Sequence, residues 1–100
     1  MNNQAINRIA NKITNKFNIV PYGRGNNGRM VQINDLDLYF SYDTIVAFRA
    51  PGYGFKVSKN IWSTTTGGHL NAIDGGDKSG RLEYEQFMIE LARLIEEKGL

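Results

Sequence analysis

Four short segments rich in apolar residues follow one another between residues 30 and 58, and no stretch of helical length separates them. They cover residues 30–33, 36–41, 44–48 and 54–58. Parallel neighbouring strands need a crossover of a dozen or more residues, whereas antiparallel neighbours need only a tight turn. The segments therefore predict an antiparallel sheet of about four strands.

Segments with helical periodicity flank this sheet. Apolar residues recur on one side of residues 3–17, which predicts an N-terminal amphipathic helix. Residues 66–73 follow a run of hydroxyl residues and predict a short helix capped by a threonine. Residues 83–98 predict a C-terminal amphipathic helix with an apolar face wide enough for a homodimer seam. Because 100 residues have room for one core, we expect a single α+β domain over residues 1–100.

The residues that the chain lacks exclude several kinds of site. It has no cysteine and one histidine, which excludes disulfides, thiolate metal sites, cysteine nucleophiles and any site with two imidazoles. The acidic loop at residues 74–79 lacks the spacing of a calcium loop. We therefore expect no metal and no cofactor. The chain also lacks a basic leader and an apolar run of membrane-spanning length, so we expect a soluble cytoplasmic protein with no membrane contact.

Charge is distributed unevenly along the chain. Residues 1–30 hold five bases and no acid, whereas residues 61–100 hold seven acids and four bases. Such a split is typical of two solvated segments whose fields complement each other within the fold or between subunits, and it also suits a basic face for an anionic partner. We expect self-association into a homo-oligomer, a dimer or higher.

Three glycines in residues 23–28 match the G-x-G-x-x-G spacing of dinucleotide-binding loops. In that motif the glycines open a helix whose N-terminus holds the pyrophosphate, whereas here a predicted strand follows. The segment therefore predicts a hairpin loop. Its candidate binding residues are Arg24 and Arg29, because an arginine in an open loop can hold a phosphate or carboxylate through two hydrogen bonds.

The segment from Trp62 to His69 combines hydroxyl groups, glycines and the single imidazole at a predicted helix start. Hydroxyls and unpaired backbone N–H groups together suit a phosphate or another anion. The candidate ligand-binding residues are Trp62, Ser63, Thr64, Thr65, Thr66 and His69, with Arg49 and Lys56 from the neighbouring strands.

A structural interpretation of the same segment stays open. In it one threonine caps the helix, Trp62 belongs to the core, and His69 makes a structural hydrogen bond. No acidic residue lies close to His69 in sequence to orient it as a base. We therefore expect no catalytic residue and no enzyme activity.

The strands also carry tyrosines and basic residues, such as Tyr39 and Arg49. Aromatic rings beside positive charges suit the stacking of nucleic-acid bases.

Two strings carry a resemblance to known proteins. The first is Ser41-Tyr42-Asp43-Thr44-Ile45-Val46-Ala47, and the second runs from Val57 to Asn71 through Asn60, Trp62-Ser63-Thr64-Thr65-Thr66 and His69. The chain resembles a widespread group of small proteins encoded by phages, archaeal viruses and plasmids, with an S-Y-x-T-x-V-A strand before a W/Y-S-x-T-T-x-x-H segment. This resemblance implies a mobile-element accessory protein and no particular reaction.

These observations favour a non-enzymatic phage or mobile-element protein that binds an anionic, nucleotide-like ligand and sequesters a host defence signal. One alternative is an anti-CRISPR-like inhibitor whose partner is a host defence protein. Another is a nucleic-acid-binding accessory factor that uses the basic residues before position 30. In each case we expect the protein to act in the cytoplasm of the host cell.

Overall fold

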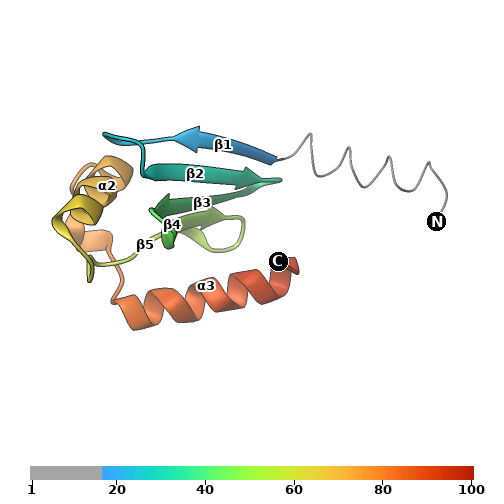
Figure 1. Cartoon of the computed structure of the whole chain (residues 1–100). Helices are drawn as coiled ribbons and strands as arrows, with labels where there is room; N and C mark the ends of the chain where they lie inside the picture. Colours follow the sequence, from blue (N-terminus) through green and yellow to red (C-terminus); the bar gives the residue numbers. More distant parts are fainter. Residues whose placement is uncertain (1–16) are drawn as a thin grey trace.

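A five-stranded antiparallel sheet and two later helices make up the fold in the computed structural model, which describes residues 17–100, with Phe17 described by its backbone alone (Figure 1). The strands lie side by side in chain order, so each pairs with its neighbour in sequence. They are β1 (Phe17–Pro21), β2 (Gly28–Ile33), β3 (Leu36–Ser41), β4 (Thr44–Ala50) and β5 (Gly54–Val57). The helices are α2 (Thr64–Asp74), the 3-10 turn η1 (Lys78–Gly80) and α3 (Tyr84–Lys98).

The predicted order of elements, an N-terminal helix followed by about four strands, is wrong. The described chain opens with a fifth strand, β1, in which Phe17 pairs with Ile33 and Pro21 with Arg29. Phe17 fits the helical spacing of the residues before it, but its backbone is paired in the sheet. The rest of the predicted helix falls on residues 1–16, which lie outside the described residues. The broad α+β class and the antiparallel pairing are confirmed.

α3 lies along one face of the sheet and packs mainly against β3 and β4 (Figure 1). Its apolar side buries Phe87, Leu91 and Leu94, as the helical spacing predicts. These side chains form a cluster with apolar residues of the third and fourth strands, which are Leu36, Leu38, Phe48 and Ala50. This cluster is the larger of the two parts of the core.

A β-bulge in β4 supplies the second part of the core. Tyr39 pairs with Ala47 and Phe40 with Ile45, so Val46 is an extra residue without a partner on β3. Val46 and Ala47 are both fully buried and both pack against Leu70 of α2. The bulge thus places two consecutive side chains on the α2 side, where regular alternation would provide one.

α2 begins two residues earlier than predicted, and its cap is a serine. The Ser63 hydroxyl accepts a hydrogen bond from the Thr66 N–H, which is the usual cap geometry. The prediction of a threonine cap is therefore wrong, because Ser63 already satisfies that donor. The prediction for the last helix agrees with α3 within one residue. No helix of the described part of the chain is long and apolar enough to cross a membrane.

Arg81 fixes the end of α2 to the segment before α3. It is 8% exposed and donates two hydrogen bonds to the Asp74 carboxylate, at 2.7 and 3.0 Å. It also donates to the Asn71 side-chain oxygen at 3.0 Å. The hydrogen bond from Arg81 holds the pKa of Asp74 below its ordinary value.

The first prediction concerns the α3 cluster. Phe87→Ala removes a fully buried ring and is expected to lower the free energy of unfolding by about 3–5 kcal/mol, since it leaves a cavity. Ile89→Ala, at a position that is 53% exposed, should change it by no more than about 0.5 kcal/mol. Urea denaturation of both variants measures the difference. Equal losses would contradict this assignment of the core.

The second prediction concerns acid stability. A carboxyl whose pKa is lower in the folded state stabilises the fold above its unfolded pKa, about 3.9, and loses this effect as the pH falls through the folded value. Asp74→Asn is expected to cost about 1–3 kcal/mol at pH 7. The difference from the wild type should shrink as the pH falls below about 4. Urea denaturation across this pH range is the measurement, and a constant difference would contradict the role of Asp74.

Candidate functional site

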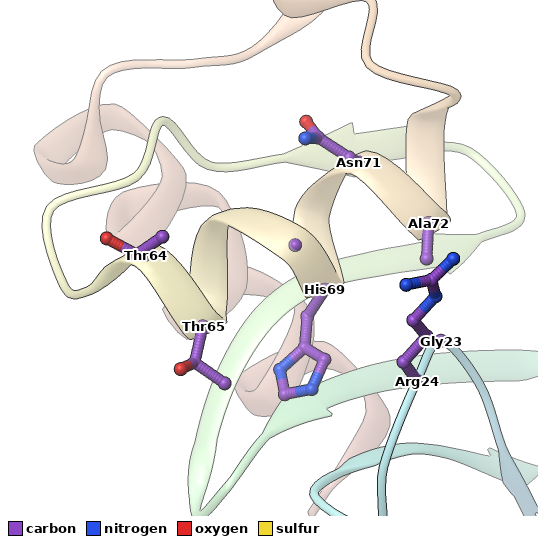
Figure 2. Close-up of a pocket in the computed structure, with 8 residues that line it drawn as sticks. Gly23, Arg24, Thr64, Thr65, His69, Asn71 and Ala72 are labelled. Carbon is purple, nitrogen blue, oxygen red and sulfur yellow. The ribbon is translucent and has the colours of Figure 1, made fainter.

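A groove of about 460 Å³ lies between α2 and the loop that joins β1 to β2. Figure 2 shows His69 projecting from α2 between Thr65 and Arg24, with the Arg24 side chain extending toward Ala72. The lining residues are Gly23, Arg24, Thr64, Thr65, Gly68, His69, Asn71 and Ala72. The groove therefore follows one side of α2 rather than its N-terminal end alone.

Glycines let the β1–β2 loop approach His69 closely. A Cβ at Gly28 would lie 2.6 Å from the Tyr22 carbonyl oxygen and 3.2 Å from His69 Cδ2. The first distance is shorter than any real Cβ contact, so no larger residue fits without movement of the backbone. The Tyr22 N–H donates to the Gly28 carbonyl at 3.1 Å, which closes the loop. The glycine spacing thus serves the packing of the loop on α2.

A chain of hydroxyl groups holds the His69 ring from beneath. His69 Nδ1 lies 2.6 Å from Ser41 Oγ, and Ser41 Oγ lies 3.0 Å from Thr66 Oγ1. Thr66 Oγ1 in turn lies 3.4 Å from Ser63 Oγ, the cap of α2. Ser41, Thr66 and His69 are each at most 4% exposed. The end of β3 and the start of α2 are therefore joined by a buried polar network.

The hydrogen-bond partners of this network select one tautomer of His69. If Ser63 donates to Thr66, Thr66 to Ser41, and Ser41 to Nδ1, each hydroxyl proton has an acceptor. The geometry of the contact between Ser63 and Thr66 has Ser63 as the donor, so the Thr66 proton is directed to Ser41 and the Ser41 proton to Nδ1. We therefore assign Nδ1 as the acceptor and Nε2 as the N–H donor. Nε2 has no hydrogen-bond partner among the described residues, which leaves it free to donate to a ligand.

Two tyrosines flank the imidazole. The Tyr22 ring lies 5.8 Å from the His69 ring, and the Tyr42 ring lies 6.0 Å from it. Tyr22 donates its hydroxyl proton to the Phe40 carbonyl at 2.8 Å. Burial and the neighbouring Tyr39 raise the pKa of Tyr22 above its ordinary value, so it stays a neutral donor. These contacts fix the plane of the His69 ring.

The structure brings four of the predicted site residues together at the groove. They are Arg24, Thr64, Thr65 and His69. Ser63 and Thr66 belong to the hydroxyl network beneath it. Their oxygens are engaged in capping α2 and in holding His69, which is the structural role that the sequence left open.

The other four predicted residues lie elsewhere. The Trp62 ring packs against the Tyr84 ring of α3, at 5.6 Å. Arg49 lies 4.8 Å above the Phe55 ring on the strands. Lys56 lines a separate pocket beside Tyr53, Arg93 and two glutamates of α3, and Arg29 lines another on the face that α3 partly covers. None of these four residues lines the groove.

Sequence reasoning missed Ser41 and Tyr22. Ser41 alternates with apolar residues of β3, which predicts an outward position, but α2 covers that end of the strand. It opens the first of the two strings that carry the resemblance, and His69 stands in the second. The occurrence of both strings in one chain was the signal that could have indicated a contact between Ser41 and His69.

The groove offers hydrogen-bond donors and one positive charge. Its polar groups include the Arg24 guanidinium, two threonine hydroxyls and the Nε2–H of His69, and no acidic residue is among its lining residues. Ser41 and His69 carry the functional groups of a nucleophile and a base. However, Ser41 is only 2% exposed, and its hydroxyl oxygen already has two hydrogen-bond partners. The described residues contain no group of acids and histidine that could hold a metal ion.

The model of a protein family of unknown function, DUF8033, matches residues 2–89. The chain belongs to the DUF8033 family. No curated protein and no solved structure matches the chain significantly. All the lining residues of the groove lie within the part that matches the DUF8033 model. The match does not test the resemblance to phage and plasmid proteins, which stays a prediction.

The third prediction tests the hydroxyl network. Ser41→Ala leaves Nδ1 of His69 and the Thr66 hydroxyl without their partner, so the free energy of unfolding should fall by about 1–3 kcal/mol. Long-range ¹⁵N NMR should show the Nε2–H tautomer in the wild type and a tautomer mixture in the variant. Ser79→Ala, which removes an exposed hydroxyl, is the control. An Nδ1–H tautomer in the wild type would contradict the assigned direction.

Proposed function

We propose that this DUF8033 protein binds a small anionic ligand of nucleotide size in the groove between α2 and the β1–β2 loop. One observation carries the proposal: Arg24, Thr64, Thr65 and a pre-oriented His69 line a single groove. The sequence suggested an anion at the helix start, whereas we propose that the ligand lies along the side of α2.

The charge and hydrogen-bonding character of the groove support an anion. Arg24 supplies a permanent positive charge and a planar fork of donors that matches phosphate or carboxylate oxygens. Thr64 and Thr65 add exposed hydroxyls on the same side of α2. With no acid among the lining residues, nothing in the described groove repels a negative charge.

The size and shape of the groove support a nucleotide-like ligand over a bare ion. Its volume of about 460 Å³ falls within the range of roughly 300–1,000 Å³ that holds cofactors and drug-sized molecules. Gly23, Gly68 and Ala72 give it small apolar surfaces against which a sugar or base can lie. The phosphate would then face Arg24, and a ring acceptor would face Nε2 of His69.

Sequestration is the mode of action that this site supports. The hydroxyl network holds the His69 ring rigidly, and the buried Ser41 oxygen already has two hydrogen-bond partners in this network. A pre-organised donor set lowers the entropy lost on binding and favours slow release of an unchanged ligand. In the setting implied by the resemblance, such a ligand is a nucleotide signal of host defence.

The fourth prediction tests the ligand class. Isothermal titration calorimetry with mononucleotides, cyclic dinucleotides and inorganic phosphate should give binding for at least one nucleotide. Arg24→Ala should weaken this binding by about tenfold or more, since it removes charge-assisted hydrogen bonds worth about 1.5–3 kcal/mol. Thr65→Val should weaken it less, because a neutral hydrogen bond contributes about 1 kcal/mol.

Arg29→Ala is the matched control, because Arg29 is also exposed and lies near the same loop but lines a different pocket. Its nucleotide affinity should equal that of the wild type. If no nucleotide binds the wild type, or if the two arginine variants lose affinity equally, the groove is not the ligand site.

A further inference from the structure

A smaller pocket, of about 250 Å³, is lined by Lys59, Asn60, Lys78 and Arg81. These lining residues include three bases and no acid, and none of them lines the groove beside α2. The bases come from two segments of the chain, one that follows β5 and one that joins α2 to α3. Positive side chains that converge on a concave surface attract an anion.

Backbone hydrogen bonds hold these two segments side by side. The Lys59 N–H donates to the Leu82 carbonyl, and the Leu82 N–H donates to the Val57 carbonyl, both at 2.8 Å. Ser58 and Leu82 also form a parallel bridge. The backbone that carries Lys59 and Arg81 is therefore fixed before a ligand arrives, which lowers the entropy lost on binding.

The guanidinium of Arg81 is buried, but one of its nitrogens is unused. Arg81 is 8% exposed, and its Nε and Nη2 atoms donate to Asp74 and Asn71. Its third nitrogen, Nη1, has no hydrogen-bond partner among the described residues. The fully buried side-chain atom that lacks a partner in this part of the chain is the Tyr53 hydroxyl, so solvent reaches Nη1. Since Arg81 lines the pocket, its two Nη1 protons are available to a ligand there.

The two lysines add positive charge that can be directed to a ligand. Lys78 is exposed and forms no ion pair with a described residue. The carboxylate next to it in sequence, Asp77, instead accepts from the N–H and the hydroxyl of Ser79. Lys59 pairs with Glu83, but the two side chains are 51% and 73% exposed. Because an exposed ion pair contributes little to stability, Lys59 can turn to a ligand at a small cost.

We propose that this pocket binds a phosphate group, held by Nη1 of Arg81 and by the ammonium groups of Lys59 and Lys78. A phosphate dianion has acceptor oxygens that match both guanidinium and ammonium donors. The volume of about 250 Å³ is below the range of roughly 300–1,000 Å³ that holds drug-sized ligands. Inorganic phosphate or a small phosphomonoester therefore fits better than a whole nucleotide, so the site differs from the groove in its ligand as well as its residues.

¹⁵N–¹H NMR of the full chain, with inorganic phosphate and with glycerol phosphate, tests the proposal. Phosphate should shift the side-chain Nε–H signal of Arg81 and the amide signal of Lys78 until the site is saturated. Sodium chloride at equal ionic strength should not, because it only screens the charges. The compound that binds more tightly identifies the source of the phosphate group, free or esterified.

Substitution of an exposed lysine tests the site without disturbing the core. Lys78→Ala should weaken phosphate binding about fivefold or more, because it removes a charge-assisted hydrogen bond. Lys78→Arg keeps the charge and should retain most of the affinity. Lys98→Ala is the matched control, because Lys98 is also exposed but lies at the end of α3 and does not line the pocket. It should bind phosphate like the wild type.

The proposal is overturned if neither phosphate compound shifts the Arg81 signal, if chloride shifts it equally, or if Lys98→Ala weakens binding as much as Lys78→Ala. Shifts confined to Arg24 and Thr65 would assign the phosphate to the groove and would also overturn it. Arg24→Ala should leave phosphate binding at Arg81 unchanged. Failure of this site and failure of the proposed function are therefore measured separately.

Discussion

The contact of 2.6 Å between Ser41 Oγ and His69 Nδ1 joins the two parts of the molecule that form the groove. Ser41 ends β3, whereas His69 lies in the middle of α2. A buried polar group is costly unless it is satisfied, so this pair restricts α2 to positions in which both atoms meet. The groove, the direction of the imidazole and the position of the β1–β2 loop follow from that restriction.

The two faces of the sheet are used differently. On one, α3 supplies a conventional apolar layer through Phe87, Leu91 and Leu94. On the other face, the bulge at Val46 provides an apolar surface on which α2 packs, and polar side chains form the rest of the contact. An apolar layer tolerates changes of similar volume, whereas a hydroxyl network tolerates few. We therefore regard the α2 side as the more specific of the two.

Much of the fold could be predicted from the sequence, because alternation and helical spacing are local signals. The four later strands and α3 were recovered in this way. β1 was missed because Phe17 fits the helical spacing of the residues before it, and only the backbone of Ile33, its partner in β2, reveals the strand. Local spacing cannot distinguish a helix from a strand when the pairing partner of the strand lies elsewhere in the sequence.

The candidate site was less predictable, because its geometry depends on contacts between distant segments. The hydroxyl run correctly marked the start of a helix, but the partner of His69 lies 28 residues away, in a position that alternation assigns to solvent. Arg49 and Lys56 were grouped with the site because their strands were expected beside it. The order of strands in the sheet places them away from the groove.

The order of the strands also bears on how the chain reaches this structure. Every strand pairs with its neighbour in sequence, so the sheet can form as a series of hairpins that each close a short loop at a small cost in entropy. The contact between β3 and α2 spans a much longer loop. Folding is therefore expected to build the sheet first, so the groove forms only once α2 has packed on a sheet that already exists.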